Sequence, residues 1–327
     1  MRVIHDLREL GKDHRASAVT IGNFDGVHLA HQKLLRKVVA TAKASGATAT
    51  ALTFEPHPIQ LLAPEHAPKL LTPLERKTRL IESLGLELLV VLPFTRELAH
   101  LSPLEFVRQI LVGRVHAASV HVGPNFRFGY RQSGDVEILA ELARQEGFRL
   151  DVLPNLEVRG ERVSSTRIRE LLSVGRVELA ARLLGRPFSV EGPIVAGLGV
   201  GRKHTVPTLN LAPVEGQLPK IGVYVTRTRL GGALHDSVTN VGHKPTFGDH
   251  RLTVETFLLN YSGEITESEM EIEFLYRLRD EMKFQNPAIL KVQIQEDARR
   301  SLKFFRLLRR IEQRRAQRIE PSRRTAT

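Results

Sequence analysis

The sequence changes its pattern of secondary structure once, near residues 186–187, and this change predicts two domains of different fold class. Before this point, apolar runs typical of strands alternate with segments whose apolar residues recur at helical spacing. After it, short β-like runs follow one another between glycines and prolines. A chain of 327 residues is also long for a single hydrophobic core, so its length agrees with a division into two domains.

The first part, residues 1–185, predicts a Rossmann-like α/β domain. Strands are expected at 18–21, 48–54, 88–92, 119–122 and 149–153, and helices at 28–44, 74–84, 103–111 and 136–144. This alternation is typical of a parallel sheet with helices on both faces. Such sheets bind ligands beyond the carboxyl ends of their strands, so a site is expected in the turns that follow strands.

The second part, residues 186–312, predicts a small antiparallel barrel. Its β-like runs lie at 194–195, 222–228, 237–241, 253–260 and 270–278, without intervening helices. A final helix is expected over 287–315. Residues 313–327 are expected to form a basic, disordered tail.

The composition argues against several classes of protein. The chain has no cysteine, which excludes disulfides and thiolate chemistry. It has no apolar stretch of the roughly 18–20 residues that a membrane span needs, and its start lacks the apolar region of a secretory signal. We therefore expect a cytoplasmic protein without a membrane partner.

The net charge of +12 is concentrated at one end of the chain. Residues 299–327 hold eleven Lys or Arg against two Asp or Glu, which leaves 37 positive and 34 negative charges for the rest. A basic segment confined to one end favours a solvated helix face, so no specific nucleic-acid partner is expected. Weak, salt-sensitive contact with polyanions is the alternative.

A glycine-rich turn, GNFDGVHLAH at 22–31, joins a predicted strand to the first helix. His28 and His31 are three residues apart, so both lie near one face of the first helical turn. Backbone N–H groups and the helix dipole favour a phosphate there, and two imidazoles can donate hydrogen bonds to its oxygens. Alone, the pair would also suit a surface position or half of a metal site, but its place after a strand favours phosphate binding.

Two further segments are candidates for phosphate binding. In VSSTRIREL (163–171), Ser165, Thr166 and Arg169 stand at a helix start, where hydroxyls and a guanidinium suit a triphosphate as well as an ordinary N-cap. In the loop GLGVGRK (197–203), the backbone can wrap phosphates and the basic residues can neutralise them, although an ordinary turn is the alternative. The candidates in that loop are Gly199, Arg202 and Lys203.

Oxygen ligands and a carboxylate follow in the β-rich part. Thr208 and Asn210 lie two residues apart, on one face of a strand, and their oxygens suit Mg²⁺. Glu255 lies within another β-like run, where it is either a solvent-facing carboxylate or a base that accepts the proton of a primary hydroxyl.

Four stretches of the first part together resemble the N-terminal module of bacterial bifunctional riboflavin kinase/FAD synthetases, which are HxGH-type nucleotidylyltransferases. These are GNFDGVHLAH, LTFEPHP (52–58), VGPNFRFG (122–129) and VSSTRIREL. The resemblance implies FMN adenylyltransferase activity, with His28 and His31 binding and polarising the phosphates of ATP. It also implies nucleotide or phosphate contacts for Gly22, Phe24, Asp25, Asn125, Ser165, Thr166 and Arg169. Flavin contacts are implied for Phe54, His57, Pro58 and Phe128, with core packing as the alternative for each.

The second part is similar to the riboflavin kinase module of the same enzymes, which is a six-stranded antiparallel barrel. The matching stretches include residues 184–203, PTLNL (207–211), GVYVT (222–226), NVGHKPTFG (240–248), VETFLLN (254–260) and LRDEMKF (278–284). The resemblance implies that Thr208 and Asn210 hold Mg²⁺ and ATP phosphates, and that Glu255 is the base for the riboflavin 5′-hydroxyl. It implies loops near 240–247 and 279–284 that close over nucleotide and flavin, with Arg279 as a flavin contact.

The resemblance thus implies riboflavin, FMN and ATP as substrates and FAD as a product, and we expect a monomer or weak oligomer. Two departures from the family pattern stand out. Ala30 replaces the usual Gly between the histidines, and His204-Thr205-Val206 replaces the common Leu-Gly-Phe. The second departure leaves open an alternative, an FMN adenylyltransferase whose kinase barrel is impaired.

Overall fold

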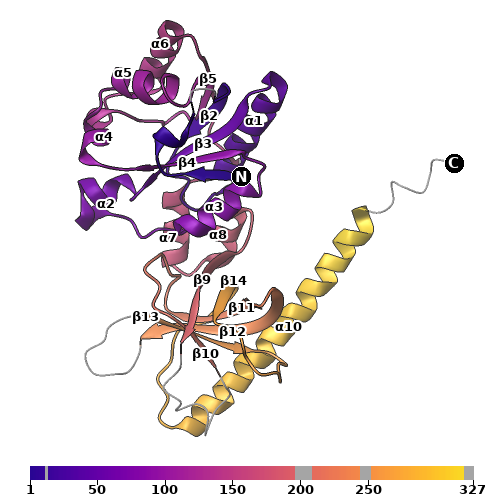
Figure 1. The fold of residues 1–327 in the computed structure, drawn as a ribbon. Coiled ribbons are helices and arrows are strands. Elements are labelled where there is room, and N and C mark those ends of the chain that lie inside the picture. The colour runs from indigo at the N-terminus through magenta and orange to yellow at the C-terminus, as the bar shows by residue number, and fades with distance from the viewer. Residues whose placement is uncertain (12–13, 196–207, 244–251, 320–327) are drawn as a thin grey trace, which may run out of the picture. The chain divides into compact units, whose positions relative to one another are not determined.

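The computed structural model describes residues 1–11, 14–195, 208–243 and 252–319 (Figure 1). By its internal contacts the chain forms two compact units. The first contains residues 1–168 and 183–185, and the second contains residues 169–182 and 186–327. Helices α7 (Ser165–Ser173) and α8 (Val177–Leu184) occupy the stretch in which the chain passes between the units. The chain crosses from the first unit to the second for the last time between residues 185 and 186, where the sequence pattern changes.

The first unit is built on the predicted parallel sheet. Its strands are β1 (Arg2–Ile4), β2 (Ser17–Ile21), β3 (Thr48–Glu55), β4 (Leu88–Pro93), β5 (Ala117–Val122) and β6 (Arg149–Val152). They are ordered β1-β4-β3-β2-β5-β6, and every neighbouring pair is parallel. The sequence did not predict β1, which has only three residues and pairs with β4 at the sheet edge.

Helices cover both faces of this sheet. The helical segments are α1 (Leu29–Ser45), α2 (Pro58–Leu62), α3 (Leu74–Glu82), α4 (Arg96–His100), α5 (Pro103–Glu105) and α6 (Val136–Glu146). Leu35 of α1 and Ile81 of α3 pack in one core with the sheet residue Ala51, whereas Leu139 of α6 packs in a second core with Leu52. Since residues 51 and 52 point to opposite faces of β3, the two cores lie on opposite faces of the sheet.

The predicted helix at 103–111 differs in its geometry. It begins with α5, where Ser102 and Glu105 form a capping box, and continues as the π-helical segment η3 (Phe106–Val112). Short 3-10 turns η1 (Leu7–Glu9), η2 (Pro64–His66) and η4 (Tyr130–Gln132), and the two-residue strands β7 (Glu157–Val158) and β8 (Glu161–Arg162), complete the unit.

The strand order reverses direction between β2 and β5. From β2, the chain builds β3 and β4 on one side and then β5 and β6 on the other. The carboxyl ends of strands at such a switch point border the crevice where α/β sheets bind ligands. The turn at 22–28 follows β2 and the segment 123–129 follows β5, so two of the predicted motifs lie at this edge.

The second unit contains the predicted antiparallel barrel, which is closed and has six strands in the order β10-β13-β12-β11-β14-β9. They are β9 (Phe188–Val195), β10 (Leu209–Leu211), β11 (Gly222–Leu230), β12 (Ala233–His243), β13 (Leu252–Leu258) and β14 (Glu269–Arg279). Fully buried hydroxyls of β11, β12 and β13 bond to one another: Thr226 with Ser237 at 2.8 Å and Thr239 at 2.7 Å, and Thr239 with Thr256 at 2.8 Å. These bonds satisfy polar groups that would otherwise be costly to bury.

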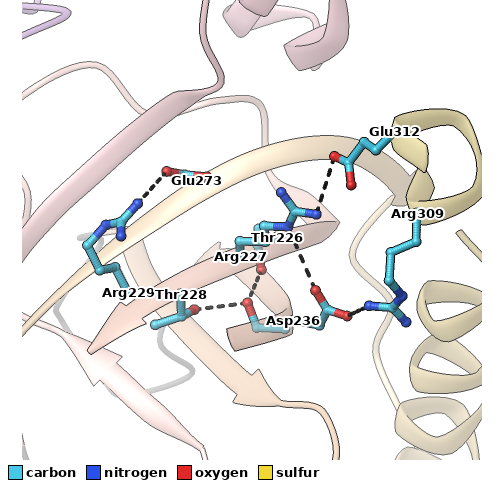
Figure 2. Close-up of polar contacts among 9 residues, drawn as sticks. Thr226, Arg227, Thr228, Arg229, Asp236, Glu273, Arg309 and Glu312 are labelled. Carbon is cyan, nitrogen blue, oxygen red and sulfur yellow. Dashed lines mark hydrogen bonds and ion pairs between the residues drawn. The ribbon is translucent and has the colours of Figure 1, made fainter. Parts of the chain in front are cut away.

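The terminal helix α10 (Pro287–Ile319) packs on the barrel through its buried Phe305, which shares a hydrophobic cluster with Val225 and Leu259. Figure 2 shows the Asp236 carboxylate beside Arg309 of α10, at 2.7 Å, and beside Arg227 of β11, at 3.7 Å. Apolar packing and a small charge network therefore hold this helix against the barrel.

The prediction of a disordered tail from residue 313 was wrong for its first part, because α10 continues through residue 319. The continuation QRRAQRI consists mainly of strong helix formers, so the helix propagates beyond Glu312, which lies 3.7 Å from Arg227 of β11. Residues 320–327 lie outside the described part.

Candidate functional sites

The turn after β2 has a strained backbone. Phe24 and Val27 adopt positive φ angles of 48° and 39°, and Gly26 adopts 83°. Positive φ is unusual for any residue with a side chain and is especially so for β-branched Val. The surroundings hold this shape: the Gly22 N–H donates to Leu52 O at 3.0 Å, and Gln32 Nε2 donates to Val27 O at 2.9 Å. Backbone strain maintained in this way is typical of functional sites.

Asp25 holds the turn in place through its carboxylate. Its oxygens accept the backbone N–H groups of Leu71, at 2.9 and 3.1 Å, and Thr72, at 3.1 Å, just before α3 begins. Its carbonyl oxygen accepts a hydrogen bond from Ser165 Oγ at 2.8 Å, which ties the start of α7 to the turn. The contact of Asp25 with a nucleotide stays a prediction, and its visible role is to join three segments.

His28 and His31 lie against each other at the start of α1. Their rings stack with centroids 3.6 Å apart and planes inclined by 15°, and Phe24 meets His31 edge-on at 5.3 Å. His28 is the N-cap of α1, and its Nδ1 accepts the backbone N–H of His31 at 3.3 Å. In a neutral ring this places the proton on Nε2, which can donate to a ligand.

The charge state of His31 follows from its surroundings. Burial lowers the pKa of His31 well below its usual value, and the positive fields of His28 and Lys77 lower it further. Its Nδ1 is buried and has no hydrogen-bond partner in the described part of the chain. At neutral pH, His31 is therefore an uncharged hydrogen-bonding group.

Other residues predicted for this site lie on separate segments. Asn125, in the segment after β5, is exposed and donates to Asn155 Oδ1 at 3.3 Å. Thr166 is exposed in the first turn of α7, and Arg169 lies one turn after Ser165 on the same helix face. The sequence did not single out Ser164, whose Oγ accepts the Arg167 N–H at 3.2 Å.

The predicted flavin contacts divide into two groups. Phe128 is 7% exposed and packs in the core against Phe106 and Phe126, and its contact with a flavin stays a prediction. His57 lies at the edge of the turn at 22–28, with its Nε2 3.0 Å from Asn23 Nδ2.

His57 is also the N-cap of α2, and Pro58 is the first residue of that helix. Phe54, at the end of β3, is half-buried and meets Phe94 edge-on at 5.6 Å. His57, Pro58 and Phe54 therefore lie at the carboxyl end of β3.

On the barrel, Asn210 and Glu255 occupy directly opposite positions of the neighbouring strands β10 and β13, and Asn240 of β12 is opposite Glu255 on the other side. Opposite residues of antiparallel strands share one face, with Cβ atoms about 4.5–5.5 Å apart. Thr208 is exposed and lies two residues before Asn210. The structure therefore brings Asn210, one of the two predicted metal ligands, and the predicted base Glu255 to one row on the barrel.

The remaining predicted site residues of this unit are Arg279 and those of the glycine-rich loop. Arg279 uses its guanidinium within the protein, because its Nε and Nη2 donate to the buried Asp297 of α10 at 3.1 and 2.7 Å. Its Nη1 donates to Asp280 O at 2.9 Å, and the contact of Arg279 with a flavin stays a prediction. The predicted phosphate residues Gly199, Arg202 and Lys203, and the altered segment 204–206, lie outside the described residues.

Comparison with known proteins assigns each half of the chain to a protein family. The family described as FAD synthetase matches residues 10–167, and the riboflavin kinase family matches residues 184–305. The chain is 32% identical to each of three curated bifunctional riboflavin kinase/FMN adenylyltransferases, from Buchnera aphidicola, Bacillus subtilis and Escherichia coli. Each match covers 94% of this chain. The match covers 100%, 99% and 98% of their own lengths, respectively. The chain belongs to the bifunctional riboflavin kinase/FMN adenylyltransferase family.

A solved structure also shares the fold of this family member. It is described as a macrolide-efflux protein from Streptococcus pneumoniae, and it matches 90% of this chain and 96% of its own with a TM-score of 0.81 and 26% identity. In the described ranges of the present chain, every helix is too short or too polar to span a bilayer.

Two residues near the candidate sites of this riboflavin kinase/FMN adenylyltransferase were missed from the sequence. Asn240 was noted only as the start of a loop, because its pairing with Glu255 depends on strand register. Lys77 is 4% exposed in α3. A signal for it existed, since Leu74, Lys77 and Ile81 recur at helical spacing and place the lysine on the apolar stripe.

Proposed function

We propose that this protein makes both flavin cofactors. In the first reaction, the γ-phosphoryl group of ATP is transferred to the 5′-hydroxyl of riboflavin, which gives FMN and ADP. In the second, the adenylyl group of another ATP is transferred to FMN, which gives FAD and pyrophosphate. The observation that carries this proposal is the presence, in one chain, of a histidine pair at a sheet switch point and an Asn210–Glu255 pair on a barrel, in a family of bifunctional enzymes.

In the adenylyl step, an FMN phosphate oxygen attacks the α-phosphorus of ATP and pyrophosphate leaves. His28 and His31 donate hydrogen bonds to phosphoryl oxygens whose negative charge grows in the transition state. The N-terminus of α1 adds its free N–H groups and dipole. We assign the remaining phosphate contacts to the predicted set, namely Gly22, Phe24, Asn125, Ser165, Thr166 and Arg169.

In the kinase step, Glu255 accepts the proton of the riboflavin 5′-hydroxyl as that oxygen attacks the γ-phosphorus. The Asn210 amide oxygen lies in the same row as Glu255, and the Thr208 hydroxyl belongs to the residue two positions earlier. Both are hard oxygen ligands that fit a Mg²⁺ ion, which also takes phosphate oxygens and water. When bound, that ion neutralises phosphate charge. We assign Gly199, Arg202 and Lys203 to the nucleotide phosphates of this step, as the resemblance implies.

We assign the adenylyl step to residues 1–185 and the kinase step to residues 186–312. His57, Pro58 and Phe54 are the best supported flavin contacts of the first module, because they lie at the carboxyl end of β3 next to the turn that holds His28. Phe128 and Arg279 are less supported, since packing and the Asp297 ion pair occupy them. We expect a cytoplasmic monomer or weak oligomer.

A chromatographic time course tests the function. The protein is incubated with riboflavin, ATP and Mg²⁺, and riboflavin, FMN and FAD are resolved. We expect FMN first and FAD afterwards. Formation of FAD from added FMN without any FMN from riboflavin would support the single-activity alternative, and formation of neither product would contradict the proposal.

A further inference from the structure

Lys77, the buried lysine of α3, follows a segment whose backbone is hydrogen-bonded to the turn at 22–28. Asp25 accepts the N–H groups of Leu71 and Thr72, and α3 starts at Leu74 directly afterwards. Lys77 is one turn further and is 4% exposed, on the inward face that also carries the fully buried Ile81. Burying an ammonium group is costly unless other charges or a ligand compensate for it.

Three groups of the site act on the charge of Lys77 or respond to it. The carboxylates of Asp25 and Glu55 favour its charged form and oppose the lowering of its pKa by burial. Its positive field in turn contributes to the low pKa of His31. Ile81, one helical turn after Lys77 on the same face, packs in one core with Phe24 and Val27, and Phe24 contacts His31. This packing places the face of α3 that carries Lys77 against the turn of the histidine pair.

The donors of Lys77 are not used within the described part of the chain. In that part, Lys77 forms no side-chain hydrogen bond or ion pair, whereas Asp25 already accepts three backbone hydrogen bonds. An ammonium group has three N–H donors. Donors of a largely buried lysine that no described residue accepts are available to an anionic ligand.

We propose that Lys77 supplies the fixed positive charge that holds the ATP phosphates beside His28 and His31 during adenylyl transfer. This inference rests on the proposed FMN adenylylation. His31 is uncharged at neutral pH, so it can donate a hydrogen bond but adds no positive charge. Without Lys77, the negative charges of Asp25 and Glu55 would lose the positive charge that they act on, and they would oppose the binding of an anion.

The test compares Lys77→Met with wild type and with the double variant Lys77→Met/Glu55→Gln. Steady-state FAD formation from added FMN gives KM for ATP and kcat, and riboflavin phosphorylation by the same preparations is the internal control. Lys37→Met is the matched control, because Lys37 is half-exposed in α1 and pairs with Asp151 at 3.4 Å. Wild-type FAD formation tests the function itself, and only the ratio between variants tests Lys77.

We expect Lys77→Met to raise KM for ATP at least about tenfold, on the scale of a lost charge-assisted hydrogen bond, with a smaller change in kcat. The double variant removes the opposing carboxylate and should recover much of that loss, which a purely packing role would not do. A KM for ATP within about twofold of wild type, or equal losses in the single and double variants, would overturn the proposal. If Lys77→Met unfolds the first unit, Lys77→Gln replaces it with the same expectations.

Discussion

At the scale of single residues, the two sites use different physical means. In the first unit, a neutral His31 stacks on His28, so His31 offers a phosphate a hydrogen bond without charge. On the barrel, a carboxylate lies opposite an amide, which is an arrangement suited to proton transfer beside a metal-bound phosphate. His31 and Glu255 belong to different units of the chain.

Exchange of one residue in each site should separate the two activities. We expect His31→Ala to lower FAD formation from FMN by about 10²–10⁴-fold and to leave FMN formation unchanged, because it removes a group that stabilises phosphoryl charge. Glu255→Ala should lower FMN formation by a similar factor and spare FAD formation. Rates with riboflavin and with FMN are measured separately, and each variant is the control for the other. Loss of both activities in both variants would contradict two independent sites.

The low pKa of His31 predicts acid sensitivity. In the folded state His31 resists protonation, whereas in the unfolded chain it binds a proton below about pH 6.5. The free energy of unfolding should therefore fall as the pH drops below about 6.5, and His31→Gln should reduce this fall. Urea unfolding at pH 7.5 and 5.5 measures it. An equal loss of stability in wild type and variant would show that His31 is not its source.

At the scale of elements, the position of α10 depends on its apolar contacts with the barrel. Its buried face carries Phe305, while Phe304, next to it, is half-buried and stacks on Tyr276 with centroids 5.8 Å apart. The charge pair of Arg309 and Asp236 is partly exposed, so it contributes little beside this apolar contact (Figure 2).

Removal of the buried Phe305 ring should therefore lower the stability of the second unit far more than removal of the neighbouring Phe304 ring. We expect Phe305→Ala to lower the free energy of unfolding of the second unit by about 3–5 kcal/mol, because it leaves a cavity between the helix and the barrel. Phe304→Ala is the matched control and should cost less than half as much. Thermal and urea unfolding monitored by circular dichroism measure both. Equal losses would show that the helix does not depend on the buried contact.

At the scale of the whole molecule, the excess of positive charge lies in a part of the sequence that contains no residue of the two candidate sites. All described residues of both sites precede residue 300, while eleven of the 48 basic residues lie in 299–327. The helical residues 313–319 extend this basic segment beyond the Phe305 contact.

Deletion of residues 313–327 should therefore leave both turnovers intact and remove any binding to polyanions. The deletion keeps Phe305, Arg309 and Glu312, so the described contacts of α10 with the barrel remain. Rates of FMN and FAD formation, and retention on heparin at low and high salt, measure the two effects. A loss of either turnover would show that the basic end takes part in catalysis.

Local chemistry in the sequence was enough to determine the two fold classes and the histidine pair. Alternation of strands and helices, followed by strands alone, predicts a parallel sheet and a barrel because side-chain periodicity is a local property. In the same way, the spacing of His28 and His31 places both on one helical turn.

Only the tertiary structure decided which neighbours these residues have. The pairing of Glu255 with Asn210 and Asn240 depends on strand register across a closed barrel, and the burial of Phe128 depends on the packing of η3. Asp25 became the anchor of α3 because chain segments 46 residues apart meet. Such contacts join distant parts of the chain, and local spacing carries no information about which of them meet.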